Sequence, residues 1–312
     1  MKGAINVLFG NKEQRDLVLE TAKNYADSIG VTLIFGAMVS SVSKNCHYPD
    51  SDYDSVFLYL KEDFPNQTYV LSSETEGDLI RKCYAEDEVF EYIPFWEATS
   101  FLHQMIEQTY KMESNWYHVN WVFMSPYTWD PYGMQNRLLP LLNHIFESKN
   151  EIAYRKEELR SHRRDLDRER ASTKKYLRTV HAAATIEWCL KYPECPPMDL
   201  QSLLYGLNRE YLWREISNIL EKARDDARKY ASPAFTRGVA KDDFRRPAIV
   251  TSYNLLLIEY IDEMVRDADA AAVSEKCTKK ERAAVVDLMC QLIRRSVFEN
   301  EPLLYHSKRK YF

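Results

Sequence analysis

The most constraining feature of the sequence is an acidic segment that runs directly into an apolar one. PDSDYD at residues 49–54 is followed by SVFLYL at residues 55–60, which is rich in β-branched and aromatic residues and predicts a buried strand. Because side chains alternate along a strand, we expect Asp52 and Asp54 on one face. Two carboxylates that close repel each other unless a cation lies between them. The pattern therefore indicates a divalent metal, and an all-oxygen site suits Mg²⁺ or Mn²⁺.

A turn is the alternative reading of the same residues. Asp50, Ser51 and Asp52 are ordinary turn residues and could simply start the strand. A turn accounts well for Asp50 but poorly for Asp54, since an aspartate at the start of an apolar strand is disfavoured. From these residues alone, both readings stay open.

The composition is that of a soluble globular protein. Of 312 residues, 45% are hydrophobic and 29% charged, and this length favours two domains. The formal net charge of −5 argues against a protein that coats nucleic acid generally, although it is compatible with a local basic cleft. The six cysteines form no C-x-x-C pair, no signal-peptide pattern is present, and the apolar stretch 31–39 is too short to span a bilayer. We therefore expect a cytoplasmic protein with no membrane partner.

Helical and strand patterns alternate in the first part of the chain. A helix is expected from an N-cap at Asn11 to a stop at Gly30, followed by a strand at residues 31–35. Further on, we expect a short helix around residues 78–84, an alternating stretch at 88–93 and a helix at 97–112. From Gln135 onward the pattern is helical nearly to the end.

Glu91 is a lone glutamate among alternating apolar residues. It could be an edge-strand charge that discourages aggregation, which is common. It could equally be a third carboxylate that faces the aspartate pair. Both interpretations are kept.

One predicted helix carries a basic stripe. Lys174, Arg178 and His181 are spaced at i, i+4 and i+7 and so share a face, with Lys175 beside it. The stripe could be the outer face of a surface helix, or a clamp in which ammonium and guanidinium groups neutralise phosphates. The run from Arg155 to Arg170 mixes both signs and is expected to be a solvated face.

Residues 40–54 resemble the nucleotidyltransferase motif of the DNA polymerase β-like superfamily, which is Gly-Ser, a spacer and Asp-x-Asp, with a third acid on a later strand. The closer similarity is to the predicted nucleotidyltransferase branch associated with RNA repair. Its pattern G-S-x-x-x-G-x-x-x-P-D-S-D-Y-D aligns without a gap with S-S-V-S-K-N-C-H-Y-P-D-S-D-Y-D here. The stretch 115–126, K-K-Y-L-R at 174–178 and P-P-M-D at 196–199 resemble later segments of that branch.

The chain departs from the pattern of that branch at several positions. Ser40 and Asn45 stand where glycines are usual, so a backbone that approaches phosphate closely carries side chains here. Val42 and Val56 replace common arginines and remove two possible phosphate contacts, and Asn120 replaces a usual glutamate. The aspartate pair is intact.

The resemblance implies an α+β fold. A small mixed β-sheet nucleotidyltransferase domain with flanking helices would span residues 1–134, and a largely helical domain would span 135–312. It also implies that Asp52 and Asp54 hold two Mg²⁺ or Mn²⁺ ions with Glu91 as the third carboxylate, and Glu88 and Glu97 are the alternatives for that third position.

The resemblance further assigns the phosphate contacts. Ser40 and Ser41 would bind the β- and γ-phosphates, and Lys174, Lys175 and Arg178 would neutralise the triphosphate and the pyrophosphate leaving group.

The implied activity is a metal-dependent nucleotidyltransferase that moves a nucleoside monophosphate from a nucleoside triphosphate to a hydroxyl. The acceptor could be an RNA 3′ end such as that of a tRNA, which we favour, another nucleotide, or a protein hydroxyl. The rival interpretation is a weakened nucleotidyltransferase fold that acts as a nucleotide or RNA sensor, or as a partner-binding module.

Overall fold

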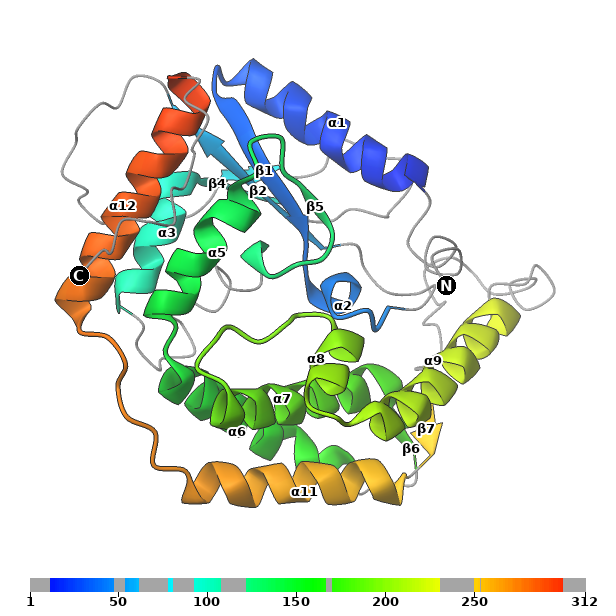
Figure 1. Cartoon of the computed structure of the whole chain (residues 1–312). Helices are drawn as coiled ribbons and strands as arrows, with labels where there is room; N and C mark the ends of the chain where they lie inside the picture. The colour runs from blue at the N-terminus through cyan, green and yellow to red at the C-terminus, as the bar shows by residue number, and fades with distance from the viewer. Residues whose placement is uncertain are drawn as a thin grey trace. The chain divides into compact units, whose positions relative to one another are not determined.

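The structure is a computed structural model that describes residues 12–47, 54–61, 78–80, 93–107, 122–166, 170–230, 250–252 and 254–299 (Figure 1). The helices are α1 (Lys12–Ser28), α2 (Ser40–Ser43), α3 (Ala98–Glu107), α5 (Met134–Ile145), α6 (Ser148–Leu166), α7 (Thr173–Lys191), α8 (Leu200–Gly206), α9 (Glu210–Tyr230), α11 (Leu255–Ala270) and α12 (Lys279–Phe298). The strands are β1 (Thr32–Met38), β2 (Ser55–Leu60), β3 (Asp78–Ile80), β4 (Ile93–Glu97), β5 (Thr128–Trp129), β6 (Arg170–Ser172) and β7 (Val250–Ser252).

Contacts divide the chain into two compact units, each assembled from separate segments. The helical unit comprises Met1–Leu8, Ser40–Asp52 and Ser148–Ser274, and the sheet unit comprises Phe9–Val39, Tyr53–Glu147 and Glu275–Phe312. This division differs from the two consecutive domains, residues 1–134 and 135–312, that the sequence predicts. Helices α5 and α12 group with the sheet, whereas the 40–52 segment groups with the helices.

The sheet unit contains a mixed sheet of five strands in the order β3-β4-β2-β1-β5. β2 pairs antiparallel with β1 and parallel with β4, while β3 and β5 add antiparallel strands at the edges. The strands predicted at residues 31–35 and 55–60 are both present, and every residue of β2 is buried, as its apolar composition predicts. Together with the helices, this sheet confirms the α+β fold class.

Helices cover both faces of the sheet in this unit (Figure 1). On one face, Phe57 and Tyr59 form an apolar cluster with Val18 and its neighbours on α1. On the other face, the ring of Phe35 lies 5.1 Å from that of Phe123, and α3 packs on β2 and β4. α1 ends where predicted, because Gly30 has the left-handed φ of 67° that a glycine adopts without strain.

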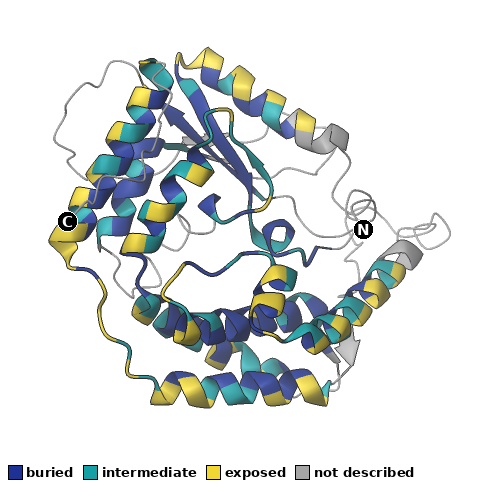
Figure 2. Ribbon diagram, in the orientation of Figure 1, coloured by how far each residue is buried: buried dark blue, intermediate teal, exposed yellow. Residues whose placement is uncertain are grey.

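The helical unit is organised around α7. Helices α6, α8, α9 and α11 all contact α7, and most of its residues are buried (Figure 2). The alanines at positions 182–184 are fully buried. Such small side chains let neighbouring helices approach closely, so α7 forms the core of this unit rather than a surface helix.

The prediction of a short helix around residues 78–84 is wrong for the first three residues. Asp78–Ile80 form β3, which pairs antiparallel with β4. Pairing with a neighbouring strand outweighs the local helical pattern over these three residues.

The charged run from Arg155 to Arg170 is not a solvated face throughout. Arg155 is only 1% exposed, and its guanidinium lies 2.7 Å from the carboxylates of both Glu151 and Glu158. Farther along α6, Arg163 pairs with Asp262 of α11 at 2.6 Å. The mixed signs let the charges of this run pair within α6, as at Arg155, and with a neighbouring helix, as at Arg163.

Within the part of the chain that the structure describes, no helix is long and apolar enough to cross a membrane.

Candidate functional site

The segment after β1 begins with a tight turn, α2. Ser40 and Asn45 both adopt the left-handed backbone conformation, with φ of 60° and 57°. The N–H of Lys44 donates to the carbonyl of Ser40 at 3.3 Å, and that of Cys46 to Ser41 at 3.0 Å. The left-handed region is costly for residues other than glycine, so these hydrogen bonds hold a conformation that the side chains disfavour.

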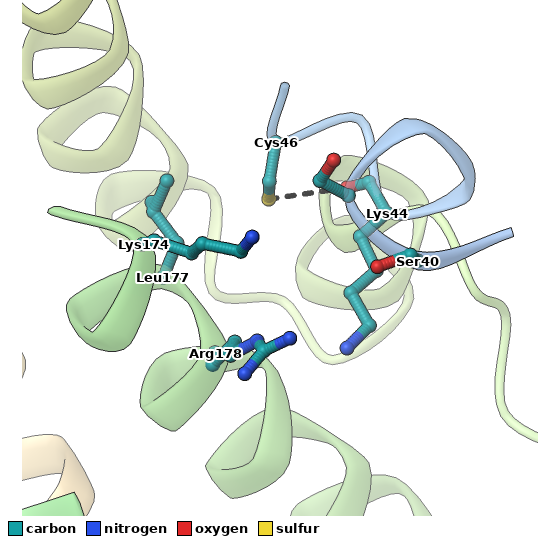
Figure 3. Close-up of a pocket in the computed structure, with 7 residues that line it drawn as sticks. Ser40, Lys44, Cys46, Lys174, Leu177 and Arg178 are labelled. Carbon is teal, nitrogen blue, oxygen red and sulfur yellow. Dashed lines mark hydrogen bonds between the residues drawn. The ribbon is translucent and has the colours of Figure 1, made fainter. Parts of the chain in front are cut away.

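This turn and α7 form a pocket inside the helical unit (Figure 3). Its lining residues are Ser40, Ser41, Lys44, Cys46, Lys174, Leu177 and Arg178. Lys174 and Arg178 lie one helical turn apart and extend from α7 toward the turn. The pocket thus gathers four of the five residues predicted to contact phosphates, from positions more than a hundred residues apart in the sequence.

Lys44 is a third cationic residue of the pocket that the sequence patterns did not identify. Its side chain is buried, with 6% exposure. Burial lowers the pKa of Lys44 to about 8; the negative charge of Glu158 opposes this, while the positive charges of Arg155 and Arg178 add to it. An amine with that pKa carries most of its charge at neutral pH and takes up a proton more readily when an anion approaches.

The acidic partner of this cluster is Glu158 of α6. Burial alone would raise its pKa, but the neighbouring charges of Arg155 and Lys44 lower it, so the carboxylate is ionised. The buried charges are therefore balanced by pairing: Arg155 contacts both Glu151 and Glu158, and Lys44 adds a further positive charge beside them.

Two neighbouring groups with potential chemistry are neutral. Burial raises the pKa of the Cys46 thiol to about 12, so it is not a nucleophile at neutral pH. Burial and the charges of Lys44 and Arg155 hold the pKa of His181 well below its usual value, and its Nε2 lies 3.1 Å from the carbonyl of Met198. By its spacing, His181 belongs to the same helix face as Lys174 and Arg178. Because its imidazole is neutral, it adds no positive charge to that face.

The P-P-M-D segment at residues 196–199 holds the turn in place. The N–H of Leu200 donates to the carbonyl of Lys44 at 3.1 Å, and Asp199 caps α8 by accepting from the N–H of Ser202 at 2.8 Å. The end of this segment therefore links the two parts of the pocket: the carbonyl of Met198 contacts His181 of α7, and the N–H of Leu200 contacts the turn.

Lys175 does not line the pocket. Its ammonium group pairs with the carboxylate of Asp165 on α6. It differs in this from its neighbour Lys174, because adjacent residues on a helix point about 100° apart.

Of the predicted carboxylates, the structure describes Asp54 and Glu97. Asp54 directly precedes β2, and its carbonyl accepts from the N–H of Val39 at 2.8 Å, which aligns it with the end of β1. Asp52, Glu88 and Glu91 lie outside the described residues. In the described ranges no group of three or more Asp, Glu, His or Cys residues could hold a metal ion.

Glu97, an alternative third carboxylate, lies at the end of its strand away from Asp54. It ends β4, and its carboxylate accepts from Thr99 Oγ1 at 2.5 Å and from the N–H of Ser100 at 2.7 Å, at the start of α3. Because β2 and β4 are parallel with Tyr59 opposite Glu97, this glutamate lies at the opposite end of β2 from Asp54.

Comparison with known proteins shows which family the chain belongs to. Residues 15–241 match the sequence model described as RNA repair pathway DNA polymerase beta family (RlaP), which is more than half of the chain. The chain belongs to this family. The match includes the pocket turn, the acidic segment, α7 and the P-P-M-D segment, so it supports a polymerase beta-like nucleotidyltransferase of the RNA-repair branch.

One curated relative is an uncharacterized protein of Bacillus subtilis (strain 168), YcgL. It is 24% identical over 213 residues, covering 66% of this chain and 75% of the relative. No solved structure matches the chain.

The departures from the sequence pattern of the RNA-repair branch now have structural counterparts. Both positions where that pattern has glycine, Ser40 and Asn45, have left-handed backbone. The turn geometry that glycine favours is thus retained with other side chains in place. Val42 and Val56, which replace arginines, are buried and contribute to packing instead.

Proposed function

We propose that this chain is a metal-dependent nucleotidyltransferase that moves a nucleoside monophosphate from a nucleoside triphosphate to a hydroxyl acceptor, with an RNA 3′ end such as that of a tRNA as the favoured acceptor. The observation that carries the proposal is the pocket between α2 and α7. There two hydroxyl-bearing residues, Ser40 and Ser41, meet the cationic side chains of Lys44, Lys174 and Arg178. Family membership supports the transferase class.

The pocket chemistry suits a phosphate chain. Ammonium and guanidinium groups make strong, charge-assisted hydrogen bonds to phosphate oxygens, and serine hydroxyls donate further ones. We assign the pocket to the β- and γ-phosphates. As pyrophosphate leaves, Arg178 and Lys174 stabilise the negative charge that develops on it, and Lys44 retains its proton because the anion raises its pKa.

Access to the pocket requires side-chain movement. Its free volume is about 20 Å³, which holds about one water molecule. Arg178 is exposed and Lys174 is half-buried, so these two long side chains can retract toward solvent. Lys44 is buried and stays at the base of the pocket.

The metal ligands we propose are Asp52, Asp54 and Glu91, whose oxygen donors suit Mg²⁺ or Mn²⁺. The parallel register of β2 and β4 supports this set, because both strands start at the same edge, Asp54 directly precedes β2, and Glu91 stands two positions before Ile93 in the sequence. When bound, the ions would neutralise phosphate charge and lower the pKa of the attacking hydroxyl.

The test is transfer of label from each α-³²P-nucleoside triphosphate to total RNA and to protein, together with pyrophosphate release. We expect label on RNA ends. The double substitution Asp52→Asn with Asp54→Asn should lower the rate by roughly 1,000-fold or more, since it removes the metal carboxylates. Lys222→Ala, on the exposed face of α9, is a control for charge loss and should leave the rate unchanged.

Two results would contradict the proposal. Transfer that is unaffected by the double aspartate substitution would remove the metal carboxylates from the reaction. Tight magnesium-dependent binding of ATP without pyrophosphate release, whatever acceptor is supplied, would favour the nucleotide-sensor alternative.

A further inference from the structure

The sheet unit contains a second cavity, which shares no lining residue with the pocket between α2 and α7. It has a volume of about 440 Å³, and α1, β1, β2 and the 126–129 segment form its walls. The residues that line it include Leu19, Met38, Ser55, Phe57, Tyr127 and Trp129. This volume falls in the range of about 300–1,000 Å³ that small-molecule sites occupy.

The floor of the cavity is formed by the sheet and carries two aromatic residues. Gly36 lies opposite Phe57 in the β1–β2 pair and opposite Trp129 in the β1–β5 pair, so both rings are on its face of the sheet. A Cβ at Gly36 would come within 2.5 Å of the Phe57 ring, which shows that this ring lies directly over the strand backbone. Phe57 is buried in the cluster with α1, whereas Trp129 is half-buried and has the ammonium group of Lys23 5.2 Å from its ring centroid. Trp129 is therefore the ring on which a planar ligand can stack.

Ser55 places an unsatisfied hydroxyl on the same face. It lies opposite Met38, another residue of the cavity wall, and two residues before Phe57, so its side chain is directed to this face. Its side chain is 1% exposed, and its Oγ has no hydrogen-bond partner among the described residues. A buried hydroxyl without a partner lowers stability, so alanine would fit this position better unless a ligand supplies the partner.

A single acidic group lies at the rim. Asp16 of α1 lines the cavity and is exposed, and its carboxylate can accept hydrogen bonds from an amino group. The cavity therefore combines an aromatic floor, one hydroxyl at its depth and one carboxylate at its mouth. This combination suits a planar, nitrogen-containing ring that carries an exocyclic amino group.

We propose that this cavity binds an amino-bearing purine base, stacked on Trp129, hydrogen-bonded to Ser55 and with its amino group directed to Asp16. Ser55 follows Asp54 directly, so the base would be held at the end of β2 that carries this predicted metal ligand. That the base belongs to a reacting nucleotide rests on the proposed function; binding of the base itself does not.

The experiment is calorimetric titration of adenosine, without metal or phosphate, into the full chain. We expect saturable binding, weakened at least tenfold for inosine, which lacks the amino group, and absent for ribose. A parallel titration with a short oligoribonucleotide ending in adenosine distinguishes a free nucleotide from an RNA end as the source of the base.

Three variants sharpen the test. Ser55→Ala should weaken adenosine binding about fivefold or more while leaving the thermal midpoint unchanged or raised, because it removes an unsatisfied group. Leu19→Trp should abolish binding by filling the cavity. The matched control is Ser296→Ala on α12, whose hydroxyl donates to the carbonyl of Leu292 at 2.9 Å: it should lower the thermal midpoint without changing binding.

The outcomes separate this inference from the proposed function. No adenosine or oligonucleotide binding, or binding that Ser55→Ala and Leu19→Trp leave unchanged, overturns the purine site even if nucleotidyl transfer is intact. Adenosine binding that depends on Ser55 upholds the site even if no transfer is detected.

Discussion

Two regions of the molecule, the pocket lined by α2 and α7 in the helical unit and the surroundings of β2 in the sheet unit, accommodate buried polar groups differently. In the helical unit, buried Arg155 contacts two carboxylates, and Lys44 lies in the electrostatic field of the same cluster. In the sheet unit, the core around β2 is apolar, and the buried hydroxyl of Ser55 has no partner among the described residues. A buried charge requires a partner, whereas a neutral hydroxyl can be buried alone at a smaller cost. Near the pocket the buried charges therefore depend on a network of partners, whereas around β2 the packing is apolar apart from one hydroxyl.

The largest effect expected from this contrast is at Arg155. Arg155→Met leaves Glu151 and Glu158 buried without their main cation and should lower the free energy of unfolding by about 3–5 kcal/mol, measured by urea denaturation. Arg160→Met is the matched control on the same helix, because Arg160 is 48% exposed and its ion pairs are worth at most about 1 kcal/mol. Equal losses for the two variants would remove the distinction between network and surface charges.

The next effect is a pH dependence at Lys44. Its pKa is about 8 in the folded chain against 10.5 for an ordinary lysine, so the unfolded chain binds more protons between these values and stability rises with pH across that window. Lys44→Met should therefore raise the free energy of unfolding by up to about 3 kcal/mol at pH 7, and the gain should shrink as the pH rises from 8 to 10.5. Urea denaturation at pH 7 and pH 10 measures both values. A gain that does not change with pH would contradict the lowered pKa.

A smaller effect distinguishes pocket cations from neighbouring ones. Arg178→Ala should weaken ATP binding about tenfold without metal, because it removes a charge-assisted contact worth about 1.5 kcal/mol. Lys175→Ala, whose ammonium pairs with Asp165 outside the pocket, should change affinity less than about twofold. Calorimetric titration at low and high salt measures both. Equal losses would show that overall charge, and not the pocket, attracts the nucleotide.

The smallest effect concerns backbone strain in the turn. Ser40→Gly relieves a left-handed residue at φ 60° and should raise the free energy of unfolding by about 0.5 kcal/mol, since the gain is partly offset by the greater freedom of glycine in the unfolded chain. Gly30→Ala in the sheet unit should act in the opposite direction, losing about 1 kcal/mol at φ 67°. Thermal or urea unfolding measures both signs. Destabilisation by Ser40→Gly would mean that the serine hydroxyl contributes more than the strain costs.

Local patterns predicted much of this architecture. The apolar run of β2, the helix that ends at Gly30 and the helix that carries Lys174 and Arg178 all form as predicted, because each depends on periodicity and end signals over a few turns or strand residues. Local patterns predicted a helix at Asp78–Ile80, but pairing with β4 makes these residues a strand, β3. They also predicted a solvated face at Arg155, but the packing of α6 buries this side chain.

The sequence by itself determined which chemistry the chain can carry: the aspartate pair entering a strand, the serine turn and the basic stripe are local signals, and each depends on residue type and spacing. Only the tertiary structure decided which of these residues meet. It brings Ser40 and Ser41 to Lys174 and Arg178, and it places Lys44 in the same pocket. Lys175 instead pairs with Asp165 outside the pocket, and burial keeps His181 neutral. Burial and the charges of neighbouring helices set these outcomes, and both depend on contacts between residues that are distant in the chain.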